Sequence, residues 1–222
     1  MEVINYLLGF KDYYIVQNTQ TFNFSLDSVL LPNFVTINKN VNKILDIGCG
    51  NAPIPLILST KTKAKIDINN LNNQIEIING DINDIYNQFE TESFDIITCN
   101  PPFFKVNKNS NLNKNDYKTI ARHEVKLNLD DIFKIAKKLL KNNGYIAIVH
   151  RPERLLDIIL TMRKYNIEPK KIQFIYPKTN MEANILLVEG TKNGKEGLKI
   201  LPPIYTHLDN GEYTEQIKKY FE

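Results

Sequence analysis

The chain has 222 residues, 42% of them hydrophobic, and a formal net charge of +3. This length and composition can bury one hydrophobic core, and the small basic excess is compatible with a nucleic-acid partner without identifying one. There is no run of about 18 apolar residues and no basic N-terminal segment followed by an apolar one, so we expect neither a membrane-spanning helix nor a signal peptide. Two cysteines, Cys49 and Cys99, are too few for a disulfide scaffold or a zinc site. We therefore expect a reduced, cytoplasmic protein.

The N-terminal segment, residues 1–40, is predicted to form a lid. Ser25 or Asp27 is positioned to cap a short helix that carries Val29, Leu30 and Leu31. Two interpretations stay open. The segment packs on the sheet as a structural cover, or its turn at residues 24–28 closes over a bound cofactor.

A short apolar strand that begins near Lys43 ends in Asp46, and a glycine-rich turn and the start of a helix follow it. The turn contains Gly48 and Gly50, and Pro53 lies in the first turn of the helix. The glycines permit a tight turn and a close approach of the backbone to a ligand. No third glycine follows, so this is not the dinucleotide fingerprint, and the Asp46 carboxylate would repel a pyrophosphate. An acid here suits a cationic or amine-bearing ligand.

The next section is too short for a parallel crossover. Strands are predicted at Ala64–Ile68 and Gln74–Asp81, and only six residues, Asn69–Gln74, separate Ile68 from Ile75. A crossover between parallel strands needs about a dozen residues or more. We favour the hypothesis that the sequence omits a stretch near residues 66–68; the alternative is a true deletion that degrades the site. Asp81, which ends the second strand, is either a ligand-binding residue or the N-cap of a helix over residues 83–89.

The strand Phe94–Ile97 leads into a stiff turn, Asn100–Phe104, with the sequence Asn-Pro-Pro-Phe-Phe. The two prolines fix φ and lack N–H groups, so the chain after Asn100 cannot continue a sheet. In open α/β sheets, ligands bind at the carboxyl ends of the strands. The Asn100 side chain and the Pro101 carbonyl are two acceptors that can hold an exocyclic amino group, and an adjacent aromatic ring can stack on its base. A plain strand-ending turn is the alternative interpretation.

The polar segment that follows, Lys105–Tyr117, is predicted to be a mobile loop. Its lysines and the adjacent Lys118 either meet phosphates beside the site or are simply solvated. Next come Arg122, His123 and Glu124, for which we favour substrate positioning or a local salt bridge over a proton relay.

The second half of the chain alternates helices and strands before it ends in a hairpin. Helices are predicted over Asn128–Asn142 and Pro152–Tyr165, and strands over Gly144–His150, Ile172–Tyr176 and Asn184–Glu189. The last two strands are joined by so short a segment that they must pair antiparallel. His150 and Arg151 end the first of these strands and are candidates for contacts with RNA.

Taken together, these motifs resemble the bacterial tRNA1(Val) (adenine37-N6)-methyltransferase family over nearly the whole chain. The resemblance rests on Gln17, Phe22–Ser28, Asp46–Asn51, Asn100–Phe104, Arg122–Glu124 and Gly211–Thr214. It implies an α/β, Rossmann-like class I methyltransferase fold with a mostly parallel seven-stranded sheet and an antiparallel C-terminal hairpin. It also implies one domain over residues 1–222, with the lid at 1–40 and a C-terminal extension at 190–222.

The resemblance implies S-adenosyl-L-methionine as the cofactor and no metal. The implied catalytic residues are Asn100, Pro101, Pro102 and Phe103. The implied cofactor-binding residues are Phe24, Ser25, Asp27, Asp46, Gly48, Cys49, Gly50, Asn51, Asp81, Ile82 and Asn100. The implied substrate-binding residues are Phe103, Phe104, Lys105, Arg122, His150 and Arg151. The acid that binds the cofactor ribose stays unassigned, because Asp67 is a poor substitute for it.

The implied reaction is direct methyl transfer to N6 of adenine 37 in the anticodon loop of a tRNA. Asn100 and Pro101 would orient the amine, and Phe103 would stack on the flipped base. No membrane and no obligate protein partner is inferred. Three alternatives stay open: a ribosomal-RNA guanine-N2 methyltransferase, a release-factor glutamine-N5 methyltransferase, and a catalytically inactive RNA-binding relative.

Overall fold

The computed structural model describes residues 2–6, 14–18, 25–67, 74–76, 78–101 and 127–221. Its main sheet has the strand order β10–β7–β8–β6–β5–β3–β4, with β9 also paired to β7. The strands are β3 (Lys43–Ile47), β4 (Lys65–Asp67), β5 (Phe94–Cys99), β6 (Leu140–His150), β7 (Ile167–Tyr176), β8 (Ile185–Lys192), β9 (Lys199–Ile200) and β10 (Ile204–Tyr205). Only β8 runs antiparallel to its neighbours in this described sheet. The predicted fold class is confirmed, although two short edge strands bring the sheet to eight strands.

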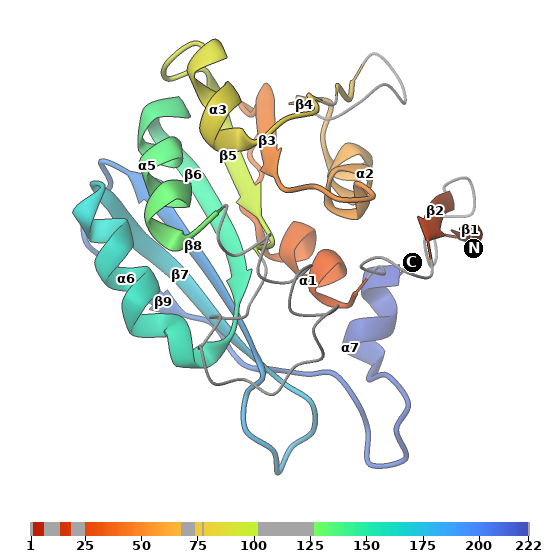
Figure 1. The fold of residues 1–222 in the computed structure, drawn as a ribbon. Helices are drawn as coiled ribbons and strands as arrows, with labels where there is room; N and C mark the ends of the chain where they lie inside the picture. Colours follow the sequence, from red (N-terminus) through yellow and green to blue (C-terminus); the bar gives the residue numbers. More distant parts are fainter. Residues whose placement is uncertain are drawn as a thin grey trace, which may run out of the picture.

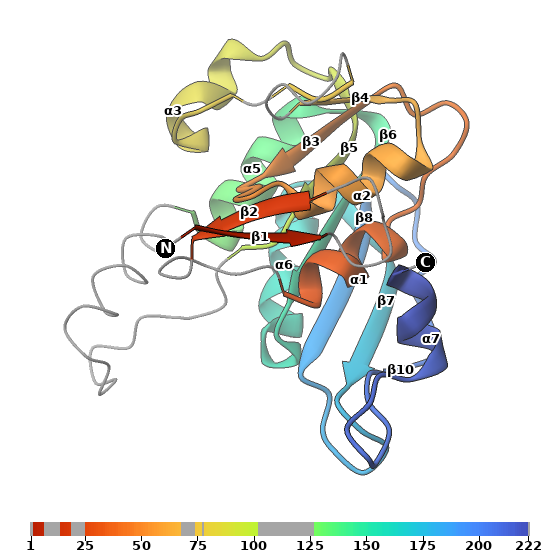
Figure 2. The ribbon, with the colours of Figure 1, turned by 90° about the vertical axis from the view of Figure 1, so that its right-hand side faces the viewer.

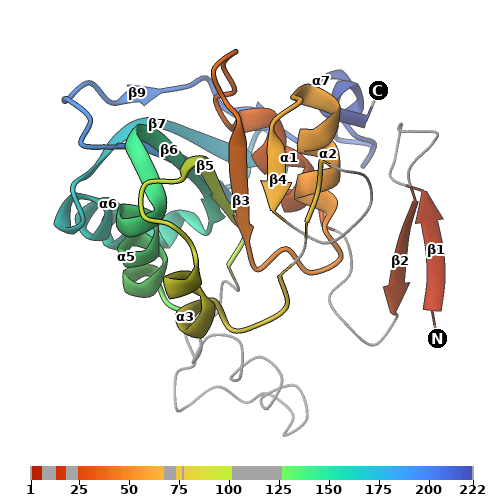
Figure 3. The ribbon, with the colours of Figure 1, turned by 90° about the horizontal axis from the view of Figure 1, so that it is seen from above.

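Helices cover both faces of the sheet (Figures 1 and 3). On one face lie α1 (Asp27–Phe34), α2 (Pro53–Lys61) and α7 (Glu215–Lys218), whose apolar side chains share one core with the sheet. On the other lie α5 (Leu129–Leu139) and α6 (Leu155–Lys164), with α3 (Ile82–Ile85) beside them. Short 3₁₀ turns occur at η1 (Tyr86–Gln88), η2 (Pro152–Arg154) and η3 (Lys219–Phe221). The sheet therefore presents its strand ends, not its faces, to a ligand.

The N-terminal segment contains a feature that the sequence did not predict. Strands β1 (Glu2–Tyr6) and β2 (Tyr14–Asn18) form a separate antiparallel pair (Figure 2). The predicted helix exists as α1, but the predicted cap is wrong, because Leu26 is the N-cap and makes no side-chain cap bond. The Ser25 hydroxyl instead donates to Asp27 Oδ2 at 3.4 Å.

The C-terminal end of α1 is tied to the middle of the sheet by a buried ion pair. Glu189 on β8 accepts hydrogen bonds from the Thr36 N–H at 2.6 Å and the Thr36 hydroxyl at 2.7 Å. Lys171 on β7 lies 3.2 Å from the same carboxylate and donates to the Phe34 carbonyl at 2.6 Å. Because Glu189 is only 2% exposed, these partners compensate for the desolvation of its charge. They hold α1 against the sheet.

The connection that follows β4 is short in this sequence. An omitted stretch and a true deletion both stay predictions, because no described contact distinguishes them. β4 pairs in parallel with β3, and Ile75 forms a single parallel bridge with Ile66. The prediction of an extended strand over Gln74–Asp81 is thus wrong, because the described residues of this range form only this single bridge. Residues 68–73 lie outside the described residues.

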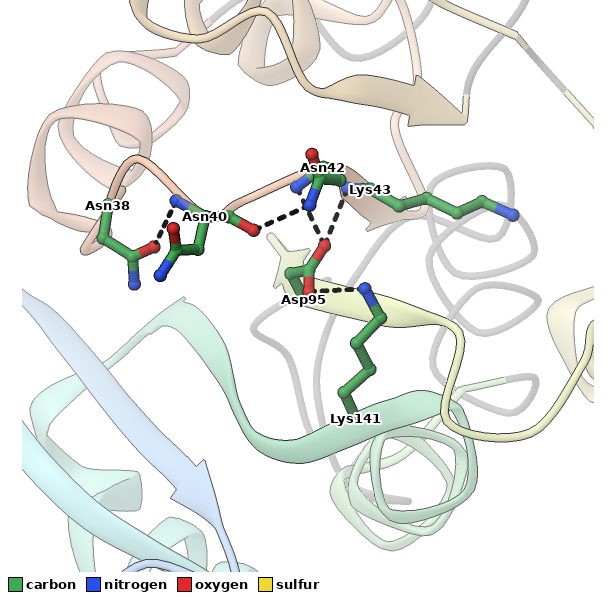
Figure 4. A network of polar contacts seen from close by, with 6 residues as sticks. All are labelled: Asn38, Asn40, Asn42, Lys43, Asp95 and Lys141. Carbon is green, nitrogen blue, oxygen red and sulfur yellow. Dashed lines mark hydrogen bonds and ion pairs between the residues drawn. The ribbon is translucent and has the colours of Figure 1, made fainter.

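One carboxylate joins the amino ends of three parallel strands (Figure 4). Asp95 on β5 accepts from the N–H groups of Asn42 and Lys43 at 2.9 Å each, and from Lys141 of β6 at 2.6 Å. Burial alone would raise the pKa of Asp95, but these three hydrogen bonds outweigh it and lower the pKa. The network lies at the opposite edge of the sheet from the carboxyl ends and is structural.

We expect Asp95→Ala to lower the free energy of unfolding by roughly 2 kcal/mol at pH 7. Because the folded-state pKa is depressed, the ionised carboxylate stabilises the fold above its unfolded pKa of about 3.9, and this contribution is lost as the pH falls through the folded value. The difference between variant and wild type should therefore shrink between pH 5 and pH 3, measured by urea unfolding. Asp209→Ala, at an exposed turn, is the control; an equal loss there, or a pH-independent loss at Asp95, would contradict the prediction.

Candidate active site

The candidate site lies where β3 and β5 end side by side. β4 pairs with one edge of β3, and β5 pairs with the other edge. The order in which the chain adds strands to the sheet therefore reverses at β3. Ligands of open α/β sheets bind outside the carboxyl ends at such a point. The register pairs Ile47 with Cys99, so the glycine turn and Asn100 leave the sheet in step. The structure thus brings together two motifs that are about fifty residues apart in the sequence.

The turn after β3 has an unusual backbone. Gly48 and Gly50 have φ values of +73° and +52°, and Ala52, the N-cap of α2, has +62°. A Cβ atom at either glycine would meet none of the described residues within 4 Å. The positive φ values therefore explain the two glycines, and in the described part of the chain the space beside them is open to a ligand. Asn51, also predicted to bind the cofactor, is exposed on the same turn.

Asp46 is buried at the end of β3, beside this turn. Its Oδ1 accepts a 2.6 Å hydrogen bond from the Thr98 hydroxyl, and its Oδ2 has no partner among the described residues. Burial raises the pKa of Asp46 to about 7, and the Thr98 hydrogen bond opposes that rise. A buried acceptor without a partner is costly, so this oxygen is suited to an amine-bearing ligand.

Thr98 is a site residue that sequence reasoning missed. It is fully buried on β5, and the sheet register pairs it directly with Asp46. The available signal was a lone hydroxyl in the otherwise apolar stretch Ile96–Cys99, one strand away from a motif acid.

The two cysteines near Asp46 are not reactive thiols. Burial and then the charge of Asp46 raise the pKa of Cys49 to about 12. Burial likewise raises the pKa of Cys99 well above its usual value. The raised pKa values favour the protonated form of both thiols at neutral pH, so neither has the low pKa typical of a cysteine nucleophile.

The start of α1 carries two predicted cofactor residues, Ser25 and Asp27, both half-buried. Burial raises the pKa of Asp27, opposed by the charge of Arg151 and by the Ser25 hydroxyl. Arg151 follows β6, so this electrostatic contact connects α1 with the carboxyl edge of the sheet. Phe24 lies outside the described residues.

Asp81 caps the helix that follows it. Its Oδ1 accepts from the Asn83 N–H at 3.0 Å, and α3 begins at Ile82. The capping interpretation is therefore confirmed, while cofactor binding by Asp81 and Ile82 stays a prediction. Ile82 packs partly against the core on the α5 face.

The motif after β5 is described only at its start. Asn100 is half-buried and Pro101 is buried, directly after the last strand residue, Cys99. The remaining predicted catalytic and substrate residues of this segment lie outside the described residues: Pro102, Phe103, Phe104, Lys105 and Arg122.

His150 and Arg151 face different surroundings. His150 is 3% exposed, and its Nδ1 accepts the Arg151 N–H at 2.8 Å, which leaves its ring proton on Nε2. Burial, together with Arg154, lowers the pKa of His150 to about 4. Arg151 is half-exposed and donates to the Asn184 carbonyl at 2.7 Å. Of the two side chains, Arg151 is the more exposed and is therefore the better candidate for contact with a substrate.

The described residues contain no cluster of three or more side chains suited to hold a metal ion. Within the same residues, no helix is long and apolar enough to span a membrane.

Several proteins are similar to this chain in sequence. The tRNA1(Val) (adenine(37)-N6)-methyltransferase of Flavobacterium psychrophilum is 23% identical over 235 positions, covering 97% of this chain and 99% of the relative. That alignment is longer than this 222-residue chain, so the relative has residues that this chain lacks. The protein of the same name from Porphyromonas gingivalis is 27% identical, covering 82% of this chain and 80% of the relative.

Solved structures share the fold at low identity. A predicted O-methyltransferase from Agrobacterium tumefaciens has a TM-score of 0.66 at 17% identity, covering 88% of this chain and 95% of that one. A geranyl diphosphate C-methyltransferase from Streptomyces coelicolor has a TM-score of 0.51 at 8% identity, covering 74% and 79%. The family model of the methyltransferase small domain matches residues 27–164, from α1 through α6. Because this match spans more than half of the sequence and contains both motifs of the site, the chain belongs to the methyltransferase small domain family.

Proposed function

We propose that this protein transfers a methyl group from S-adenosyl-L-methionine to N6 of adenine 37 in the anticodon loop of tRNA1(Val). The observation that carries the proposal is the position of Asn100 and Pro101, directly after β5 and in step with the Asp46–Gly50 turn after β3. Relatives named for this reaction align over most of the chain. A tRNA substrate is consistent with a cytoplasmic location of the protein.

The residues at the end of β3 fit the proposed cofactor. Its ammonium is a suitable donor for Asp46 Oδ2, which has no partner among the described residues. The open space beside Gly48 and Gly50 admits a ligand close to the backbone. We assign the same role to the other predicted cofactor residues: Ser25, Asp27, Cys49, Asn51, Asp81 and Ile82, with Phe24 from the sequence alone.

The bound cofactor supplies an activated sulfonium methyl group, so the protein's task is alignment. The Asn100 Oδ1 and the Pro101 carbonyl accept hydrogen bonds from the adenine N6 amine and direct its lone pair at the methyl group. Pro101 and Pro102 keep these acceptors rigid. We assign Phe103 the role of stacking on the extruded base and Arg151 a contact with a phosphate of the RNA. Most of the rate gain then comes from proximity and orientation.

The reaction is tested by incubating the protein with labelled S-adenosyl-L-methionine and undermodified total tRNA, then digesting the RNA and identifying the labelled nucleoside. N6-methyladenosine is the expected product. N2-methylguanosine would contradict the proposed base specificity, and absence of label on tRNA with the cofactor still bound would contradict the tRNA substrate. Label on a release factor would favour the glutamine-N5 alternative.

We expect Asn100→Ala to lower the rate of methyl transfer by about 10²-fold or more, because one of the two acceptors that align the amine is lost. The affinity for S-adenosyl-L-methionine, measured by isothermal titration calorimetry, should change far less. Asn180→Ala, an exposed asparagine in the β7–β8 connection, is the control and should leave the rate unchanged. Near-normal transfer by Asn100→Ala would disprove the mechanism.

Gly50→Ala and Gly211→Ala form a matched pair. Both glycines have positive φ, +52° and +89°, and open space where a Cβ would lie, so each alanine costs roughly 1–2 kcal/mol of backbone strain. Only Gly50 lies in the proposed cofactor site. We therefore expect similar losses of thermal stability but a weaker cofactor affinity, by about tenfold or more, for Gly50→Ala alone. Equal cofactor affinities in the two variants would show that the Gly48–Gly50 turn is not part of the cofactor site.

A further inference from the structure

The buried contact between Thr98 and Asp46 has a consequence for binding. We propose that Thr98 is a positioning residue that holds one oxygen of the Asp46 carboxylate, so that the other faces the cofactor ammonium and cofactor binding is coupled to release of a proton. This inference rests on the proposed function and adds a residue and a proton linkage to it.

Among the described residues, one of the two Asp46 carboxylate oxygens has a hydrogen-bond partner and the other has none. Thr98 and Asp46 are paired residues of β5 and β3, and their side chains lie on the same face of the sheet. The hydroxyl donates to Oδ1 at 2.6 Å and so fixes the rotation of the carboxyl group. Thr98 is 0% exposed and Asp46 is 6% exposed. Among the described residues no group satisfies Oδ2, so this oxygen is suited to accept a hydrogen bond from a ligand at the strand end.

The charge state of Asp46 depends on that ligand. Desolvation favours the protonated carboxyl group in the free protein, whose pKa is about 7. In the described part of the chain, the titratable groups whose charge couples to Asp46 are the thiols of Cys49 and Cys99, and the pKa of each is raised far above neutrality. These thiols do not titrate in the same range. An ammonium beside Oδ2 would favour the carboxylate, and the proton of Asp46 leaves to solvent.

The linkage predicts a defined pH profile. Below the pKa of Asp46, the affinity should fall about tenfold for each pH unit, because the carboxyl group must lose its proton before it pairs with the ammonium. Above about pH 8 the affinity should fall again, since an α-amino group loses its charge with a pKa of about 7.7–8.0. The affinity should therefore be greatest between these limits.

The experiment measures cofactor affinity and proton release by calorimetry between pH 5.5 and pH 8.5, in buffers that differ in ionisation enthalpy. Wild type should release close to one proton at pH 6. Thr98→Val keeps the side-chain volume but removes the hydroxyl that favours the ionised form. The fall in affinity toward low pH should begin about one pH unit or more higher than in the wild type, and the affinity at pH 7 should be about fivefold or more lower.

Two further variants separate positioning from packing. Thr98→Ser retains the hydroxyl but deletes a buried methyl group, so it should lose stability while keeping the wild-type pH profile. Thr206→Val removes another buried hydroxyl, which donates to the Pro177 carbonyl at 3.2 Å in the C-terminal segment. It should also leave the profile unchanged.

An unshifted profile in Thr98→Val would overturn the inference and leave the proposed function intact. Absence of proton release by the wild type at pH 6 would overturn it even if Thr98→Val did not fold. Failure of the wild type to bind S-adenosyl-L-methionine at any pH would disprove the proposed function, and the inference with it.

Discussion

The parallel pairing of β3 with β5 is the contact on which the rest of the site depends. It sets Asp46 opposite Thr98 and brings the end of β3 level with the end of β5. A slip of one residue would turn Asp46 to the other face of the sheet and separate it from Thr98. The Asp95 network at the amino ends opposes such a slip, because one carboxylate holds the starts of β3, β5 and β6 together. The hydrogen bonds at the amino ends of the strands thereby help to keep Asp46 opposite Thr98 at the carboxyl ends.

The candidate site combines a restricted backbone with a buried carboxylate that the described residues do not fully satisfy. The glycine turn and Pro101 restrict the backbone, and the core on both faces of the sheet restricts the strands beneath them. Asp46 is the exception, since it is buried with one oxygen lacking a partner among the described residues. Such a group destabilises the unliganded protein, and this penalty is removed when a ligand donates a hydrogen bond to it. This arrangement favours a ligand that brings a positive charge to the end of β3.

The short connection after β4 distinguishes this chain from the fold that its motifs predict. A crossover helix would normally pack beside β4, whereas here Ile75 returns to pair with Ile66 after a brief connection. The relative from Flavobacterium psychrophilum has residues that this chain lacks. The main sheet tolerates a short connection here because β4 lies at its edge and pairs only with β3 within the named strands. The core strands β3, β5 and β6 keep their partners.

Much of this protein was predictable from its sequence because the relevant signals are local. Alternating or continuous apolar stretches, the glycines before Pro53 and the Asn-Pro-Pro turn each act within a few residues, so they located α2, β3, β5 and the two motifs of the site. The Leu26 cap, the β1–β2 pair and the extent of β7 were not predicted, since propensity does not define boundaries. The Thr98–Asp46 bond and the Thr36–Glu189–Lys171 network were decided only by the tertiary structure. They join residues from distant parts of the chain, and only strand register and packing determine which of them meet.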